Sequence, residues 1–112
     1  MPDDALSWDE FERVVIVAGT VLRVEEFPEA RKPAFKLWVD FGPYGELKTS
    51  AQIVELYSAD DLVGRQIAGV INFPEKQVGP FRSQFLLTGF HTGNGVVITT
   101  IERPVPNGTR MA

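Results

Sequence analysis

Residues 35–41, FKLWVDF, alternate strictly between side chains that suit a core and side chains that suit a surface. A period of two is the pattern of a β-strand with one buried face, whereas a helix would repeat its apolar positions every three or four residues. Residues 47–53 alternate in the same way, and the intervening GPYGE has the composition of a turn. The two stretches therefore predict an antiparallel β-hairpin whose inner face carries Phe35, Leu37, Val39 and Phe41.

The register of this hairpin decides which side chains share its outer face. A slip of one residue would turn lysines into the core, so the apolar sets of the two strands must meet on one face. We predict that Phe41 lies opposite Leu47 and that Leu37 lies opposite Ala51. On the outer face this register pairs Asp40 with Lys48, Trp38 with Ser50, and Lys36 with Gln52.

Two short helices are predicted by their start signals. Ser7 and Ser58 are each followed three residues later by an acidic residue, Glu10 and Asp61, which is the capping-box pattern. Apolar residues on either side of each cap would form a hydrophobic staple, which pairs Leu6 with Phe11 and Tyr57 with Leu62. Gly64 would end the second helix.

Further strands are predicted at residues 14–26, 66–73, 83–90 and 96–102. Gly19 would bend the first of them, and the turn Gly93-Asn94-Gly95 would precede the last. Five main strands with a short helix between the third and the fourth follow the order of an OB-fold, a small Greek-key barrel that commonly binds ligands on the outer face of this hairpin. A small β-sandwich is the alternative architecture.

The length favours one domain, so we expect residues 1–112 to form a single, mostly β domain with a short N-terminal helix and a C-terminal extension. The chain has no cysteine, which excludes disulfides and thiolate chemistry and suits a reducing compartment. The longest apolar run near the N-terminus, residues 14–18, is far shorter than the roughly 20 residues of a membrane span. We therefore expect a cytoplasmic protein without membrane insertion.

Positive charge is concentrated in one part of an acidic chain. The net charge is −4, and residues 1–29 carry eight acidic side chains against Arg13 and Arg23. Residues 30–52 reverse this balance, with Arg31, Lys32, Lys36 and Lys48 against Asp40 and Glu46. The acidic total argues against a general nucleic-acid coat protein but is compatible with a local basic patch.

Nothing in the sequence indicates catalysis. The single histidine, His91, follows a predicted strand, and the chain has no nucleophile-elbow motif around any serine. One histidine without cysteine does not make a zinc site, and the carboxylates and glycines follow no calcium-loop or phosphate-loop spacing. We expect no catalytic residue, no metal, no cofactor and no enzyme activity.

The outward-facing Trp38 and the segment 72–85, NFPEKQVGPFRSQF, are the more informative features. Trp38 can pack under the N-terminal helix, under a loop, or in a dimer interface; it can also contact a ligand. As a ligand contact it would stack on a nucleotide base while lysines hold phosphates, or it would line a groove for an unfolded peptide. The segment 72–85 is either a solvated loop or, because it is rich in apolar residues, a loop that packs against another surface.

Three ordered stretches, ARKPAFKLWVDFG, KTSAQIVELY and LVGRQIAGVINFPEKQVGPFRSQFLLTGF, resemble the CsaA protein family. These are bacterial secretion-related chaperones built on a tRNA-binding domain that also occurs at the C-terminus of methionyl-tRNA synthetases. The resemblance runs from about Phe11 to the C-terminus. The wider domain family has an S-x-G-M pattern where this chain has Ser83-Gln84-Phe85-Leu86, which places the chain nearer the CsaA branch.

The resemblance implies an OB-fold whose terminal elements form a homodimer. It also implies peptide or tRNA ligands, docking to the protein-translocation machinery, and no catalysed reaction. A peptide groove would use Trp38, Phe73, Phe85 and Lys36, with further charge selection by Arg31, Lys32 and Lys76. The positions that match the family for RNA binding are Arg31, Lys32, Lys36, Ser50, Gln52, Asn72, Lys76 and Ser83.

The aromatic content gives the dimer independent support. A single small barrel has limited core space, and a twofold interface would cover the aromatic side chains that the core cannot hold. The aromatic residues that are hard to bury together are Trp8, Phe11, Trp38, Phe73, Phe81, Phe85 and Phe90.

Overall fold

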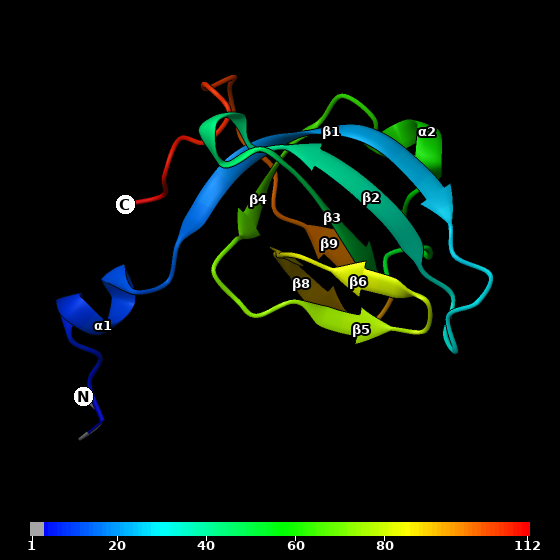
Figure 1. Cartoon of the computed structure of the whole chain (residues 1–112), viewed down its shortest axis with the longest axis horizontal. Helices are drawn as coiled ribbons and strands as arrows, with labels where there is room; N and C mark the ends of the chain where they lie inside the picture. Colours follow the sequence, from blue (N-terminus) through cyan, green and yellow to red (C-terminus); the bar gives the residue numbers. More distant parts are fainter. Residues whose placement is uncertain (1–3) are drawn as a thin grey trace.

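A computed structural model describes residues 4–112 and shows a nearly closed five-stranded antiparallel barrel (Figure 1). The strand order is β3-β2-β1-β4-β7. The barrel closes where the Gln84 N–H donates to the Lys48 carbonyl and the Thr49 hydroxyl donates to the Phe85 carbonyl, both at 2.7 Å. The five strands are β1 (Ile16–Glu26), β2 (Phe35–Asp40), β3 (Glu46–Ala51), β4 (Gln66–Val70) and β7 (Leu86–Leu87). The predicted OB-type barrel is confirmed.

Two hairpins and three short helices complete the described chain. The hairpins are β5 (Lys76–Val78) with β6 (Phe81–Ser83), and β8 (Gly89–Thr92) with β9 (Gly95–Ile98). The helices are α1 (Trp8–Glu12), the 3₁₀ turn η1 (Gly42–Tyr44) and α2 (Ala59–Leu62). Figure 1 shows that α1 lies away from the barrel, whereas the β5–β6 hairpin lies beside the barrel. No helix within residues 4–112 is long and apolar enough to cross a membrane.

Both predicted capping boxes are present. The Ser7 hydroxyl accepts from the Glu10 N–H at 3.1 Å, and the Glu10 carboxylate accepts from the Ser7 N–H at 3.1 Å. Ser58 and Asp61 repeat this reciprocal pair at the start of α2, which places Leu62 in the barrel with no exposed surface. Each box satisfies backbone N–H groups that the first helical turn leaves without partners.

The main core is built from alternate residues of the sheet. All four predicted inward residues of β2 and its end, Phe35, Leu37, Val39 and Phe41, are buried. Gly19 has a different role from the predicted bend: a Cβ at this position would lie 2.5 Å from the Phe41 ring. Gly19 therefore lets Phe41 lie directly across β1, and the irregularity of β1 falls between Val21 and Arg23 instead.

The register predicted for the β2–β3 hairpin is wrong by two residues. Val39 rather than Phe41 lies opposite Leu47, and Trp38 lies opposite Lys48 rather than Ser50. The cause is the connection, in which the Phe41 N–H donates to the Gly45 carbonyl at 2.9 Å and η1 fills the intervening turn. Gly45 has a φ of 86°, which only glycine adopts readily, so pairing begins at once with Asp40 opposite Glu46. A two-residue shift keeps each side chain on its predicted face.

The segment 72–85 forms a hairpin that packs on the outer face of the barrel. Phe81 at the start of β6 is buried, with its ring centroid 5.5 Å from that of Phe27 and 6.0 Å from that of Trp38. Phe27, Ala34 and Phe81 form a second, smaller core, against which Trp38 packs. The predicted strand 83–90 is broken into β6, β7 and β8 because the chain leaves the hairpin here and turns back into the barrel.

The C-terminal extension forms a strap along β1. The Gly108 N–H donates to the Ala18 carbonyl at 2.7 Å, and the Met111 N–H donates to the Ile16 carbonyl at 2.8 Å. These bonds use the part of β1 that β2 leaves free, since the pairing of β2 with β1 ends at Thr20 opposite Asp40. The strap thereby satisfies backbone groups that would otherwise form an open sheet edge.

Candidate ligand-binding face

Trp38 lies at the centre of a row of three side chains that crosses three strands. The pairing of β1, β2 and β3 places Arg23 opposite Trp38 on one side and Lys48 opposite it on the other. The Arg23 guanidinium carbon lies 3.9 Å from the centroid of the indole ring, which is the geometry of a cation–π contact. Trp38 is half-buried, and this row is on the predicted outer face of β2.

An irregularity in β1 brings Arg23 to this face. The register shifts between Val21 and Arg23, so Val21 and Val24 both contribute to the main core although they are three positions apart in the sequence. Without this extra residue, the alternation of β1 would point Arg23 into the barrel. The Arg23 Nε also lies 3.2 Å from a carboxylate oxygen of Glu25, which is the next outward residue of the strand.

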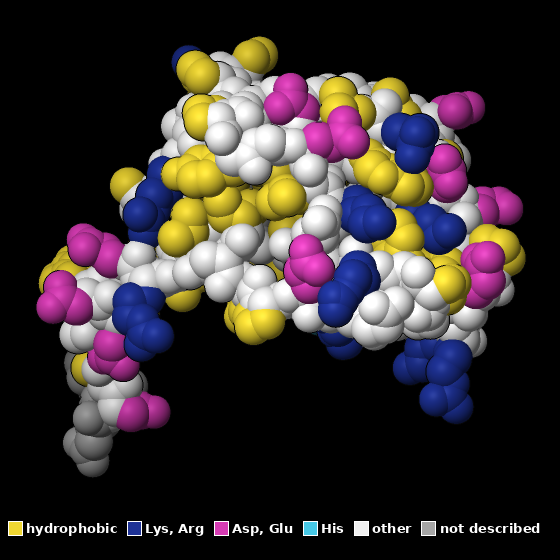
Figure 2. Space-filling model, in the orientation of Figure 1, with side chains coloured by type: hydrophobic (Ala, Val, Ile, Leu, Met, Phe, Trp, Pro, Cys, Tyr) yellow, Lys and Arg dark blue, Asp and Glu magenta, His cyan; other side chains and the backbone are white. Residues whose placement is uncertain are grey.

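Lys48 of this row and the neighbouring Lys36 lie over the aromatic rings of the second core. The Lys36 Nζ lies 4.8 Å from the Phe27 ring centroid and 5.4 Å from that of Phe81, and the Lys48 Nζ lies 5.0 Å from that of Phe81. We call this group of six residues the aromatic–cation cluster: Arg23, Phe27, Lys36, Trp38, Lys48 and Phe81. Figure 2 shows basic side chains interspersed with apolar ones on this side of the molecule, with acidic side chains around them.

An apolar groove adjoins the cluster. It has a volume of about 380 Å³ and lies between the end of β1 and the start of β2. Its lining shares Phe27 and Ala34 with the second core. The full lining is Glu26, Phe27, Pro28, Pro33, Ala34, Phe35 and Val54. The face can therefore offer an apolar surface and hydrogen-bond-donating cations to one extended ligand.

The structure brings together only part of the predicted site. Lys36 and Trp38 belong to the cluster. Arg31 and Lys32 are exposed in the loop that joins β1 to β2, beside the groove residue Pro33. Gln52, just after β3, and Lys76, on β5, are exposed as well.

Three predicted RNA contacts already make hydrogen bonds within the chain. The hydroxyl oxygens of Ser50 and Ser83 lie 3.0 Å apart, and the Ser50 N–H donates to the Ser83 hydroxyl at 3.0 Å. The Asn72 amide donates to the Arg13 carbonyl at 2.6 Å and accepts from the Val15 N–H at 3.0 Å. Ser50 and Ser83 thus join β3 to β6, and Asn72 fixes the chain where α1 leaves the barrel. Their contacts with RNA stay predictions.

Phe85 is a correction to the predicted peptide groove. Its side chain is 5% exposed, and its ring meets that of Phe41 edge-on at 4.9 Å inside the barrel. It cannot contact a ligand on the surface while the barrel is folded. Phe73, by contrast, is 56% exposed and follows the Asn72 junction directly.

Arg23 and Lys48 are the functional candidates that the sequence interpretation missed. Lys48 was placed beside Asp40 by the wrong register, whereas the observed register places it beside Trp38. Arg23 has inward parity in an uninterrupted strand, so only knowledge of the irregularity in β1 could have found it. The residues that follow it, Val24, Glu25 and Glu26, gave no signal of that irregularity.

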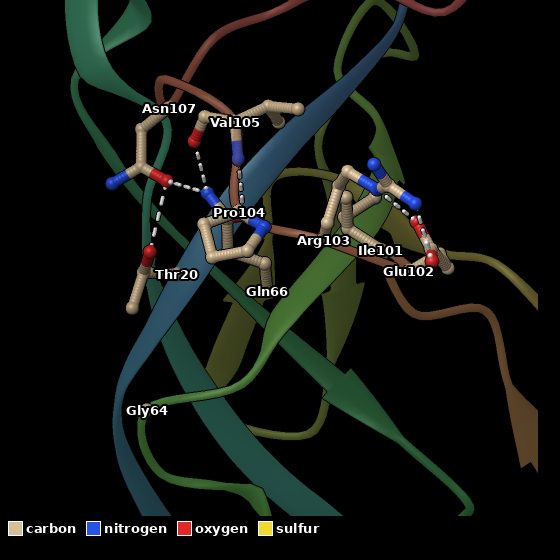
Figure 3. A pocket seen from close by; sticks show the side chains of 9 residues that line it. All are labelled: Thr20, Gly64, Gln66, Ile101, Glu102, Arg103, Pro104, Val105 and Asn107. Carbon is tan, nitrogen blue, oxygen red and sulfur yellow. Dashed lines mark hydrogen bonds and ion pairs between the residues drawn. The ribbon is translucent and has the colours of Figure 1, made fainter.

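A second depression, of about 450 Å³, lies beside the C-terminal strap (Figure 3). Its polar side chains hold the strap: the Asn107 side-chain oxygen accepts from the Thr20 hydroxyl at 2.8 Å and from the Gln66 side-chain amide at 2.9 Å. Gln66 also accepts from the Val105 N–H at 3.0 Å. These groups are satisfied within the chain, so they serve structure. Residues 4–112 contain no group of three or more His, Asp or Glu side chains placed to bind a metal ion.

Comparison with known proteins places this geometry in a family. The model of the family described as "Putative tRNA binding domain" matches residues 16–110, which include every strand and most of the strap. The chain belongs to this tRNA-binding domain family.

Solved structures that are similar to this chain include two named as CsaA chaperones. The one from Bacillus anthracis is 39% identical with a TM-score of 0.91, and it covers 96% of this chain and 99% of its own. The one from Picrophilus torridus is 36% identical with a TM-score of 0.90, and it covers 96% of this chain and all of its own. The resemblance to CsaA proteins is thereby confirmed.

Methionine–tRNA ligases carry the same domain as a small part of a longer chain. The ligase from Salinibacter ruber is 34% identical over 99 residues, which are 87% of this chain but only 14% of the ligase. In the ligase from Methanococcoides burtonii the matched part is 16% of the protein. This chain therefore spans only a small part of the length of those enzymes.

Proposed function

We propose that this chain is a homodimeric chaperone that binds unfolded, export-bound polypeptides through the aromatic–cation cluster and the adjoining groove. The observation that carries the proposal is their continuity: Phe27 lines the apolar groove and also lies under the Lys36 amine. An unfolded segment presents apolar side chains together with backbone carbonyls and carboxylates, and this face offers a complement to each. Binding alone would perform the work, without a reaction.

The degree of similarity to the CsaA chaperones supports this choice. The two chaperone structures are 39% and 36% identical over 96% of this chain, whereas the Salinibacter ruber ligase is 34% identical over 87% of it. A chaperone of this kind would work in the cytoplasm and deliver its clients to the protein-translocation machinery. Those two statements rest on the resemblance alone.

The homodimer is supported by apolar side chains that the single chain leaves uncovered. Trp8 on α1 is 83% exposed and Leu6 beside it is 65% exposed. Phe73 and Phe90 are also exposed, whereas Phe81 and Phe85 are buried within the chain. An isologous interface would bury these residues of both copies in a single contact. It would also place two ligand-binding faces on one particle.

Binding of tRNA is the second candidate function. The row Arg23, Trp38 and Lys48 favours it, because cations beside a half-buried aromatic ring suit phosphates and bases. Arg31, Lys32, Lys36 and Lys76 would add phosphate contacts, and Gln52 is exposed for a further contact. Ser50, Asn72 and Ser83 would need to share or give up their present hydrogen bonds.

One titration distinguishes the two candidates. The chain is titrated, at a low and a high salt concentration, into a fluorescently labelled denatured preprotein and into labelled tRNA. A polypeptide groove predicts preprotein binding with little salt dependence. A phosphate-binding face predicts that tRNA affinity falls by about 0.7 to 0.9 log units per contact for each log unit of salt. If neither ligand binds at micromolar protein, both functions are ruled out.

A further inference from the structure

The chain contains two Asn-Gly pairs, Asn94-Gly95 and Asn107-Gly108. This dipeptide is prone to deamidation because glycine has no Cβ to hinder its backbone nitrogen from attacking the preceding side-chain amide. The structure places the two pairs in opposite surroundings, one at the tip of the β8–β9 hairpin and the other within the C-terminal strap, bonded to the barrel.

We propose that Asn94 is a site of spontaneous deamidation and that the fold protects Asn107 from the same reaction. The Gly95 backbone nitrogen forms a bond to the Asn94 side-chain carbonyl carbon, loses its proton, and expels the amide nitrogen as ammonia. Water then opens the resulting succinimide ring at either carbonyl, which yields aspartate or isoaspartate. Water is the only co-reactant, and no oxidant or reductant is needed.

Asn94 has the freedom that this reaction requires. It is exposed in the turn, and within residues 4–112 its only recorded hydrogen bond is from its own backbone N–H to the Thr92 hydroxyl at 3.2 Å. Its side-chain amide is therefore free to rotate toward the Gly95 nitrogen. Exposed turns of small polar residues are also the segments in which the backbone moves most easily.

Asn107 is held at both reacting groups. Its side-chain oxygen accepts from the Thr20 hydroxyl and the Gln66 amide (Figure 3), and its side-chain nitrogen donates to Asp40 at 3.4 Å. The attacking nitrogen, that of Gly108, donates to the Ala18 carbonyl at 2.7 Å. Reaction at Asn107 therefore requires the strap to detach first. An opening free energy of only about 1.4 kcal/mol already slows such a reaction tenfold.

The product would alter a packed part of the hairpin. A Cβ built on Gly95 would lie 2.9 Å from the Glu55 Cβ, so the backbone at this tip rests against residues 55–56. Isoaspartate adds one carbon to the backbone at this point, and either product adds a carboxylate near Glu55. We expect the aged chain to have a displaced β8–β9 tip and one more negative charge.

Peptide mapping of the full chain tests the proposal. Cleavage after glutamate separates residues 76–102, with Asn94, from residues 103–112, with Asn107. During incubation of the native protein at neutral pH, the first peptide is expected to gain one mass unit at least about ten times faster than the second. In urea the two peptides should react at similar rates.

Two results would overturn the proposal. Equal rates in the native protein, or no mass gain in residues 76–102, would show that Asn94 is not a selective site. A rate difference that persists in urea would show that sequence rather than the fold protects Asn107. The variant N94Q serves as the control, because its longer side chain closes the ring poorly and should abolish the gain in the first peptide.

Discussion

At the scale of single residues, Phe85 and Phe73 have opposite environments although both had been expected in one groove. Phe85 packs edge-on against Phe41 in the core, whereas Phe73 is mostly in solvent. Truncating a buried phenylalanine removes its apolar contacts and leaves a cavity, so Phe85→Ala should lower the free energy of unfolding by about 3–5 kcal/mol. Phe73→Ala should lower the free energy of unfolding several times less, because its side chain is mostly in solvent. Urea unfolding of both variants checks this, and similar losses would contradict the assignment of Phe85 to the core.

Asp61 makes the start of α2 sensitive to acid. The hydrogen bond from the Ser58 backbone N–H, followed by that with the Ser58 side chain, holds the pKa of Asp61 below its ordinary 3.8. Because the folded-state pKa is the lower one, this contribution to stability is fully present above pH 3.8 and is lost as the pH falls through the depressed value.

Nuclear magnetic resonance titration of the carboxyl group should therefore give a midpoint below 3.8 for Asp61. Asp61→Asn should lower the melting temperature at neutral pH and reduce its further fall in acid. Asp60→Asn is the matched control, because Asp60 takes no part in the capping box. Equal effects of the two substitutions would rule out the capping explanation.

At the scale of elements, features that depend on neighbouring residues could be predicted from the sequence, whereas features that depend on distant residues could not. Both capping boxes and the inward residues of β2 were predictable because they depend on neighbours within a few positions. The β2–β3 register depends on how the Gly42–Gly45 turn folds, and the position of Arg23 depends on one irregular residue in β1. Neither leaves a distinctive pattern, so the row around Trp38 could not be assembled from the sequence.

Asn72 fixes the junction between α1 and the barrel. The Ile71 N–H donates to the Val15 carbonyl, which continues the β1–β4 ladder, and the Asn72 side chain accepts from the Val15 N–H in place of a backbone carbonyl. Asn72→Asp replaces the amide that donates to the Arg13 carbonyl with a carboxylate oxygen. The lost hydrogen bond should lower the free energy of unfolding by about 1 kcal/mol, and the carboxylate should repel the carbonyl oxygen. Hydrogen exchange of the Val15 amide should therefore become faster. Asn94→Asp, the same chemical change in the β8–β9 turn, should leave Val15 unaffected; unchanged exchange in Asn72→Asp would contradict the role of this clamp.

At the scale of the whole molecule, the single chain is less compact than its length allows. Its radius of gyration is 14.6 Å, against about 13 Å for a compact chain of this size. Figure 1 shows why, because α1 projects beyond the barrel and carries Trp8 into solvent. The sequence had indicated an excess of aromatic residues, but not which of them would stay outside.

The proposed dimer follows from that projecting arm. Light scattering should give a particle of twice the 12.5 kDa chain mass, because a second copy would cover Leu6 and Trp8. Trp8→Ala should shift the particle toward a monomer on dilution, while Tyr44→Ala, at another exposed aromatic residue, should not. A monomer at all concentrations of the unaltered chain would contradict the dimer but not the ligand-binding face.

The central claim is that ligands bind at the row of Arg23, Trp38 and Lys48, and one comparison of affinities tests it most directly. Arg23→Gln removes the cation over Trp38, and Arg103→Gln removes an exposed arginine of the same charge that pairs with Glu102 beside the C-terminal strap. Binding of labelled denatured preprotein should weaken about five-fold in Arg23→Gln, as expected for a contact of about 1 kcal/mol. It should not change in Arg103→Gln. Equal affinities of the two variants would contradict the claim.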